Sequence, residues 1–211
     1  MQSVAHTSIG DGIRGAVLAG EANAAARQAS SPTAHAQADY ALGLALERTD
    51  AGEARALLER AGSVAGAAGN RWIEAFALTE VHWLQARRGE HLEALIGFGQ
   101  VVDTWYRGGD WANQWLSLRH VLGLLLDLGA YDAAAVLHGA LTATGAANAL
   151  PFEPADAERL AQEAAQLLTL LGRDDFTVAV NQGTTMRNSQ IVNFVKEKIA
   201  TLITRQPLDT N

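Results

Sequence analysis

The stretch that decides the fold is Asn70 to Gly145, in which one pattern occurs twice. Residues 70–109 read NRWIEAFALTEVHWLQARRGEHLEALIGFGQVVDTWYRGG, and residues 110–145 read DWANQWLSLRHVLGLLLDLGAYDAAAVLHGALTATG. At an offset of 40 residues the copies align Leu78 with Leu118, Val81 with Val121, Leu84 with Leu124, Gly89 with Gly129 and Ala94 with Ala134. A period of this length is typical of helical repeat arrays, so the stretch predicts two alike helix-turn-helix units.

The same offset extends toward the N-terminus, where residues 32–68 form an earlier copy. Its aligned positions are Leu44 with Leu84 and Leu124, and Ala54 with Ala94 and Ala134. The small residue lies early in each second helix, where we expect the two helices of a hairpin to approach closely. Pro32 suits the first turn of a helix capped by Ser30 or Ser31, and Asp50 is expected to cap the next helix.

The two ends of the array differ from its middle. A predicted helix over residues 11–28 is the second half of a unit whose first half is missing, which suggests a fragment of a longer chain or a start within a repeat. Because stacked repeats bury their faces on neighbours, this half repeat predicts a homodimer contact through the N-terminal helix. After Gly145 the period breaks at AANALPFEPADAE. Helices within 154–204 then form a predicted C-terminal cap, with Asp174-Asp175 capping one of them.

The predicted fold is therefore all-α, a tetratricopeptide-like solenoid that forms a single domain over residues 1–211. It comprises the half repeat at 11–28, hairpins at 32–68, 70–108 and 110–145, and the capping helices at 154–204. The composition agrees, since alanine and leucine dominate the 48% of apolar residues and aromatic residues make up only 6%. This bias favours closely packed helices over sheets.

Charge and cysteine content exclude several classes of function. A net charge of −7 argues against a nucleic-acid surface, which needs clustered basic residues. The absence of cysteine excludes disulfides and thiolate metal sites. The start MQSVAHTSIG does not have the pattern of a secretory signal, and the apolar run at 121–128 is far shorter than the roughly 20 residues of a membrane span. A cytoplasmic location with no membrane association is expected.

At residues 70–145 and beyond, the chain resembles a known family region. GNRWIEAFALTEVHWLQARRGEHLEAL, GDWANQWLSLRHVLGLLLDLGAYDAAAVLHGAL and LLTLLGRDDFTVAVNQGTTMRNSQIVNF are similar, as an ordered set, to the tetratricopeptide-like C-terminal region of large actinobacterial regulators. These are LuxR-family and adenylate/guanylate cyclase-like proteins built around a STAND-type AAA+ ATPase. The likeness covers roughly residues 32–195 and implies a helical sensor or protein-interaction arm.

The resemblance carries over no enzymatic activity. The sequence has no G-x-x-x-x-G-K-[ST] loop to cradle phosphates, and neither a cyclase domain nor a DNA-binding helix-turn-helix matches. Gly10 to Gly15 spell G-x-G-x-x-G without a strand before them or a βαβ pattern after them, so a loop leading into a helix is expected. The six histidines lack metal-ligand spacing, and no nucleophile can be paired with a base. No catalytic residue, cofactor site or metal site is predicted.

The remaining candidates are surfaces. Tetratricopeptide geometry predicts a ligand or partner groove lined by Asp39, Glu47, Thr79, Trp83, Arg87, Arg119 and Asp127. The five tryptophans are Trp72, Trp83, Trp105, Trp111 and Trp115, and core packing between helices is favoured for them over a ligand surface. The same register places His82 and Gln85 at the seam between helices.

The sequence thus predicts a non-catalytic regulatory or protein-interaction module, the sensor arm of a multidomain signalling or transcriptional regulator. Its groove would bind a peptide, an effector or a partner domain, including an ATPase or cyclase domain of the same regulator. Two alternatives stay open. One is a free-standing helical domain that binds a small molecule or acts as an enzyme, and the other is a structural oligomerisation arm.

Overall fold

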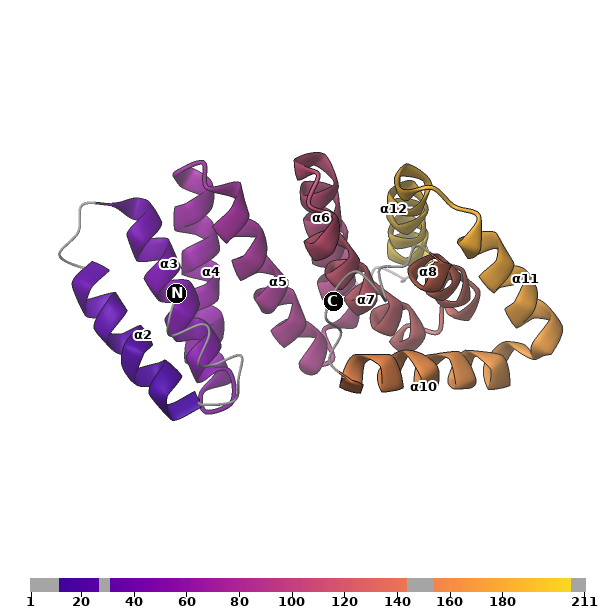
Figure 1. Ribbon diagram of the computed structural model, residues 1–211, viewed down its shortest axis with the longest axis horizontal. Helices are drawn as coiled ribbons and strands as arrows, with labels where there is room; N and C mark the ends of the chain where they lie inside the picture. Colours follow the sequence, from indigo (N-terminus) through magenta and orange to yellow (C-terminus); the bar gives the residue numbers. More distant parts are fainter. Residues whose placement is uncertain (1–11, 27–30, 144–153, 206–211) are drawn as a thin grey trace, which may run out of the picture. The chain divides into compact units, whose positions relative to one another are not determined.

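The computed structural model describes residues 12–26, 31–143 and 154–205, and these form ten helices with no strand among them (Figure 1). The all-α prediction is confirmed for this part of the chain. The chain divides into two compact units, residues 1–87 and 88–211. The sequence suggests one domain instead, and the boundary between the units lies inside the predicted hairpin at 70–108. In the described ranges, no helix is long and apolar enough to cross a membrane.

The first unit contains four consecutive helices, each packed on the next (Figure 1). They are α2 (Gly12–Ala26), α3 (Pro32–Leu46), α4 (Ala51–Ala67) and α5 (Arg71–Arg87). Between α4 and α5, Ala54 and Leu58 pack with Val81 and Leu84 in a buried apolar cluster. These residues recur at three- and four-residue steps, so each helix presents one apolar stripe to its neighbour.

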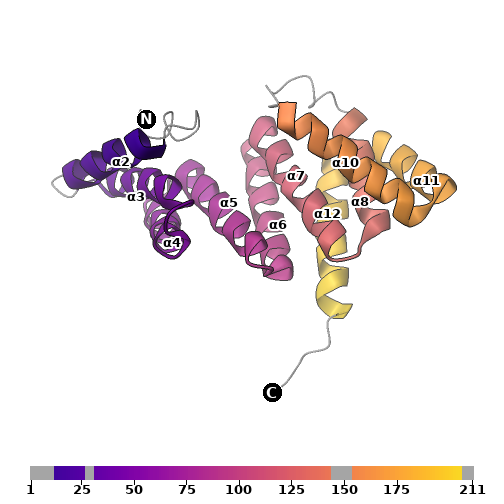
Figure 2. The same ribbon diagram turned by 90° about the horizontal axis from the view of Figure 1, so that it is seen from below.

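The second unit contains the other six helices. They are α6 (His91–Gly108), α7 (Trp111–Asp127), α8 (Tyr131–Ala143), α10 (Pro154–Leu171), α11 (Arg173–Thr184) and α12 (Asn188–Arg205). Helix α8 is the centre of this unit, since α7, α10, α11 and α12 all pack against it (Figure 2). Helix α12 also packs on α6. The start of α12 is tied to α7 by paired amides, because Gln114 Nε2 donates to Asn188 Oδ1 and Asn188 Nδ2 donates to Gln114 Oε1.

A 20-residue period, half of the period visible in the sequence, sets the helix boundaries from α4 to α8. These helices begin at residues 51, 71, 91, 111 and 131, and Gly69, Gly89, Gly109 and Gly129 end the preceding helices with positive φ. At three of the turns the residue after the glycine donates its N–H to a carbonyl five residues back: Asn70 to Ala65, Asp110 to Trp105 and Ala130 to Leu125. This is the Schellman closure, which requires a left-handed residue and so favours glycine.

Side-chain caps fix several helix starts as predicted. Ser31 Oγ accepts the Ala34 N–H ahead of Pro32, and Asp50 Oδ1 accepts the N–H groups of Gly52 and Glu53. The prediction for Asp174-Asp175 is wrong in detail. Gly172 is the N-cap of α11 and both aspartates lie inside the first turn, where their charge complements the helix dipole.

The aligned small residues Ala54, Ala94 and Ala134 are all fully buried. We expect Ala94→Leu to lower the free energy of unfolding by about 1–3 kcal/mol, because a close-packed interior must shift to admit the larger side chain. Urea unfolding measures the change. As a control, the same substitution at the exposed Ala112 of α7 should stay within about 0.5 kcal/mol. Equal effects at the two sites would contradict close packing at Ala94.

Helices α8 and α11 meet backbone to backbone. A Cβ atom added to Gly139 of α8 would overlap the carbonyl group of Val180, and one added to Gly183 of α11 would overlap the carbonyl oxygen of Val136. The α8 sequence AAAVLHGAL is rich in small residues, and nine consecutive residues from Ala133 to Leu141 are buried. Each helix therefore has a glycine at the contact, which lets α8 and α11 approach more closely than any side chain there would allow.

Candidate functional site

Helices α3 and α5 run side by side and share one face. Tyr40 of α3 lies beside Phe76 of α5. Glu47, seven residues after Tyr40, lies near Glu80, four residues after Phe76, so the two helices run in the same direction. On α5 the steps between Trp72, Phe76, Glu80, Trp83 and Arg87 are three or four residues, which puts these side chains on one stripe. We call Tyr40, Glu47, Trp72, Phe76, Glu80, Trp83 and Arg87 the α3–α5 face.

Aromatic rings form one end of the α3–α5 face. The rings of Trp72 and Phe76 meet edge to face with centroids 4.4 Å apart, and the centroid of Tyr40 is 6.3 Å from that of Phe76. Trp72 remains 54% exposed, while Phe76 and Tyr40 are half-buried. A partly exposed indole supported by a packed ring is the kind of anchor that protein interfaces use.

A pair of carboxyl groups forms the middle of the α3–α5 face. Glu47, at the C-cap of α3, and Glu80, in the middle of α5, lie close enough that each carboxyl group shifts the pKa of the other. Two carboxylates only accept hydrogen bonds, so a bond between them would require a proton on one of the groups. The Oε1 atom of Glu47 is buried and has no hydrogen-bond partner.

The surroundings favour the protonated form of this pair. Burial and then the charge of Glu47 raise the pKa of Glu80 from the ordinary 4.5 to about 8. Burial also raises the pKa of Glu47, although the positive charge of Arg87 opposes this shift. Burial and the two nearby carboxyl groups raise the pKa of Tyr40 above its usual range.

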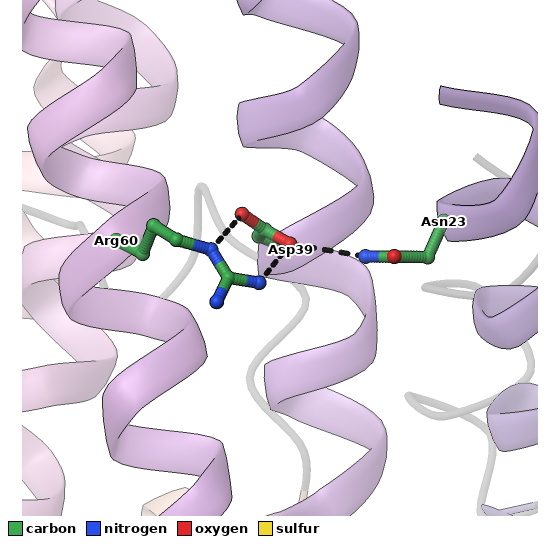
Figure 3. A network of polar contacts seen from close by, with 3 residues as sticks. All are labelled: Asn23, Asp39 and Arg60. Atoms are coloured by element: carbon green, nitrogen blue, oxygen red, sulfur yellow. Dashed lines mark hydrogen bonds and ion pairs between the residues drawn. The ribbon is translucent and has the colours of Figure 1, made fainter. Parts of the chain in front are cut away.

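Five of the seven predicted groove residues lie in the first unit, and three of these belong to the α3–α5 face. Glu47 and Trp83 are half-buried, and Arg87 is exposed at the end of α5. Thr79 differs from the prediction, because it is buried and its hydroxyl donates to the Ala75 carbonyl, a contact within its own helix. Asp39 points instead toward Asn23 of α2 and Arg60 of α4 (Figure 3).

The other two predicted groove residues, Arg119 and Asp127, belong to the second unit. Arg119 is only 4% exposed, so it does not line an open groove as the register suggests. Its charge acts on the buried His138, whose pKa is lowered chiefly by burial. Asp127 is exposed at the end of α7, where its Oδ2 lies 3.7 Å from Nδ1 of His91.

Asp39 is the centre of a polar network that links three helices (Figure 3). Arg60 of α4 donates from Nε to Oδ2 and from Nη2 to Oδ1, both at 2.7 Å, and Asn23 Nδ2 of α2 donates to Oδ1 at 3.0 Å. Asp39 and Asn23 are buried, while the Arg60 side chain is 54% exposed. An open pocket of about 280 Å³ adjoins the network and is also lined by Ala26 and His35.

The tryptophans divide between core and surface. Trp105 and Trp115 are buried, Trp83 is half-buried, and Trp72 and Trp111 are more than half exposed. Core packing, which the sequence favours for all five, therefore holds for two of them. His82 and Gln85, which the predicted register places at a seam, bond to each other through Nδ1 and Oε1 at 2.8 Å.

In the described part of the chain, no three histidine or acidic side chains gather in a way that could hold a metal ion. Gly12, in the predicted G-x-G-x-x-G pattern, is the first residue of α2, while Gly10 and Asp11 lie outside the described residues. Comparison of the chain with protein-family models, curated proteins and solved structures gave no significant match. The resemblance to the STAND-type regulators stays a prediction.

Sequence reasoning missed Glu80, Tyr40 and Phe76 of the α3–α5 face, and also Arg60 and Asn23 of the network. A signal for Glu80 exists, since an acidic residue is enclosed by the apolar stripe of Ala77, Val81 and Leu84. A carboxyl group placed there must find a partner or carry a proton. Its partner lies 33 residues earlier, on a helix that only the packing brings alongside.

Proposed function

We propose that this chain is a non-catalytic protein-interaction module of the tetratricopeptide-like, helical-hairpin solenoid type, which binds a peptide or partner domain on its α3–α5 face. The observation that carries the proposal is the 20-residue period of helices and left-handed glycines from α4 to α8. Regular helical hairpins of this kind present aligned helices as extended binding surfaces. The resemblance to regulator arms supports a signalling role in which the partner is a domain of the same regulator.

The chemistry of the α3–α5 face supports a protein partner. It combines a half-exposed indole, a half-buried indole and an exposed guanidinium, and Trp, Tyr and Arg are the residues that most often dominate binding energy at interfaces. The alternative function, binding of a small molecule, would use the pocket beside Asp39. Its volume of about 280 Å³ is below the roughly 300–1,000 Å³ of most ligand sites, and the pocket is open. The protein-interaction function is therefore preferred.

Charge reversal and truncation on the α3–α5 face test this function. With the full chain as immobilised bait, Trp72→Ala and Arg87→Glu should each reduce recovery of a bound partner by at least tenfold, because a hot-spot residue contributes about 2 kcal/mol or more. Quantitative mass spectrometry of the captured proteins provides the measurement. Charge reversal at Arg119 is not a suitable test of a binding surface, since that side chain is buried.

Matched controls lie in the second unit, where Trp111 is 56% exposed and Arg173 is also exposed. Trp111→Ala and Arg173→Glu change the same residue types at comparable exposure and should leave recovery unchanged. If all four variants capture the same partners as the unmodified chain, the α3–α5 face is not the binding surface. A partner lost only with the control variants would place binding on the second unit instead.

A further inference from the structure

The pocket beside Asp39 is lined by an arginine whose guanidinium is only partly used. Nε and Nη2 of Arg60 each donate one N–H to Asp39, both at 2.7 Å. A guanidinium carries further N–H groups on Nη1 and a second one on Nη2, and these form its outer edge. Figure 3 shows Nη1 on the side away from Asp39. In the part of the chain that the structure describes, no hydrogen bond uses Nη1, and the Arg60 side chain is 54% exposed.

Asp39 holds this outer edge in place. Its carboxylate is only 6% exposed and also accepts the side-chain amide of Asn23 at 3.0 Å, so it has a fixed position between the helices. Two parallel bonds to such a carboxylate fix the plane of the guanidinium as well as its location. An arginine held in this way loses little further conformational freedom when a ligand binds. More of the interaction energy then appears as affinity.

The outer edge of a guanidinium fits an oxyanion, because its two parallel N–H donors can meet two oxygens of a carboxylate or a phosphate group. The charges around Arg60 favour the group with the smaller negative charge. Asp39 already balances one positive charge, and the exposed Glu53 of the same helix also acts on Arg60. These acidic neighbours repel a phosphate group, which carries nearly two negative charges, more strongly than a carboxylate.

We propose that this pocket binds a small carboxylate anion, with Nη1 and Nη2 of Arg60 as its donors. The volume of about 280 Å³ accommodates a small acid rather than a drug-sized ligand. Asp39 does not touch the anion and is a positioning residue for Arg60. The pocket is lined by Asn23, Ala26, His35, Asp39 and Arg60, none of which belongs to the α3–α5 face. The inference therefore goes beyond the proposed function and does not depend on it.

Titration of the full chain with sodium acetate, followed by NMR, tests the proposal. Acetate replaces chloride at constant ionic strength, so the screening of charges does not change. The reporters are the side-chain amide of Asn23 and the Nε–H of Arg60, because both groups donate to Asp39. Both signals should shift and saturate with the same dissociation constant, in the millimolar range expected for a single bidentate contact.

Two variants and a matched control locate the site. Arg60→Lys keeps a positive charge beside Asp39 but removes the outer edge, so the affinity for acetate should fall at least about tenfold. Ala26→Leu should weaken binding as much, because a larger side chain at a lining residue fills the pocket and leaves the network intact. In Arg55→Lys the affinity should not change, since Arg55 of the same helix pairs with Glu59 and does not line the pocket. The Asn23 signal reports on all three variants.

The outcomes either support the site or overturn it. Loss of acetate binding in Arg60→Lys and Ala26→Leu, but not in Arg55→Lys, supports it whatever Trp72→Ala and Arg87→Glu do to partner capture. Shifts that stay linear in acetate concentration, or that are equally strong in Arg60→Lys, would overturn it. The same titration with inorganic phosphate tests the charge argument, because tighter binding of phosphate than of acetate would show that the assignment to a carboxylate is wrong.

Discussion

Replacing Gly183 with alanine should lower the free energy of unfolding of the second unit by about 3 kcal/mol or more. Overpacking a well-filled core costs roughly 1–3 kcal/mol when side chains can move aside. Here the added Cβ would meet the backbone of α8 at Val136 and Ala140, which moves only if the whole helix moves. Gly139→Ala should have an effect of similar size, because its Cβ would meet the Val180 backbone of α11 from the other side.

Urea unfolding followed by far-UV circular dichroism measures these changes. Gly123→Ala is the matched control, since Gly123 lies inside α7 and nothing would lie within 4 Å of the new Cβ. A helical Gly→Ala change of that kind should stabilise the chain by about 0.5–1 kcal/mol. A loss of less than 1 kcal/mol for both Gly139→Ala and Gly183→Ala would mean that α8 and α11 are not in backbone contact.

Replacing Asp39 with alanine should cost the first unit about 2–3 kcal/mol of unfolding free energy. The change removes the acceptor of three hydrogen bonds and leaves the buried amide of Asn23 without this partner. Removing one member of a fully buried ion pair costs about 3–5 kcal/mol. The cost here is smaller because the Arg60 side chain is half exposed and can be hydrated after the change.

The same unfolding measurement on Arg60→Ala should give a loss at least as large as Asp39→Ala, because it leaves the buried carboxylate of Asp39 without its countercharge. Glu59→Ala, which breaks the exposed Arg55–Glu59 pair on the same helix, should change stability by less than about 0.5 kcal/mol. If Asp39→Ala costs no more than Glu59→Ala, the network in Figure 3 contributes nothing to stability.

Most helix positions could be predicted because their causes are local. Caps at Ser31 and Asp50, and glycines at Gly89 and Gly129, act within a few residues of the chain. Gly69 and Gly109 carry the same signal, and reading all four glycines together would have revealed the 20-residue period from the sequence. Buried alanines at the aligned positions follow from the same periodicity.

The candidate site was less predictable because its contacts join different helices. The predicted groove residues were assigned to equivalent positions on successive helices. In the structure, however, Thr79 and Arg119 are buried and Arg87 is exposed. The burial of a side chain depends on which neighbour covers it, and α10 and α11 pack on α8 in a part of the chain where the repeat has ended. No period in the sequence describes that packing.

By itself, the sequence determined that the described part of the chain is all-helical and that the aligned alanines are buried, because these depend on turns and stripes within about 40 residues. Only the tertiary structure decided that Glu47 lies near Glu80, that Asp39 joins α2 to α4 through Asn23 and Arg60, and that Gly139 and Gly183 bring the backbones of α8 and α11 together. Each of these contacts depends on which helices lie side by side. Side-chain periodicity determines which face of a helix is buried, but tertiary packing determines which helices that face contacts.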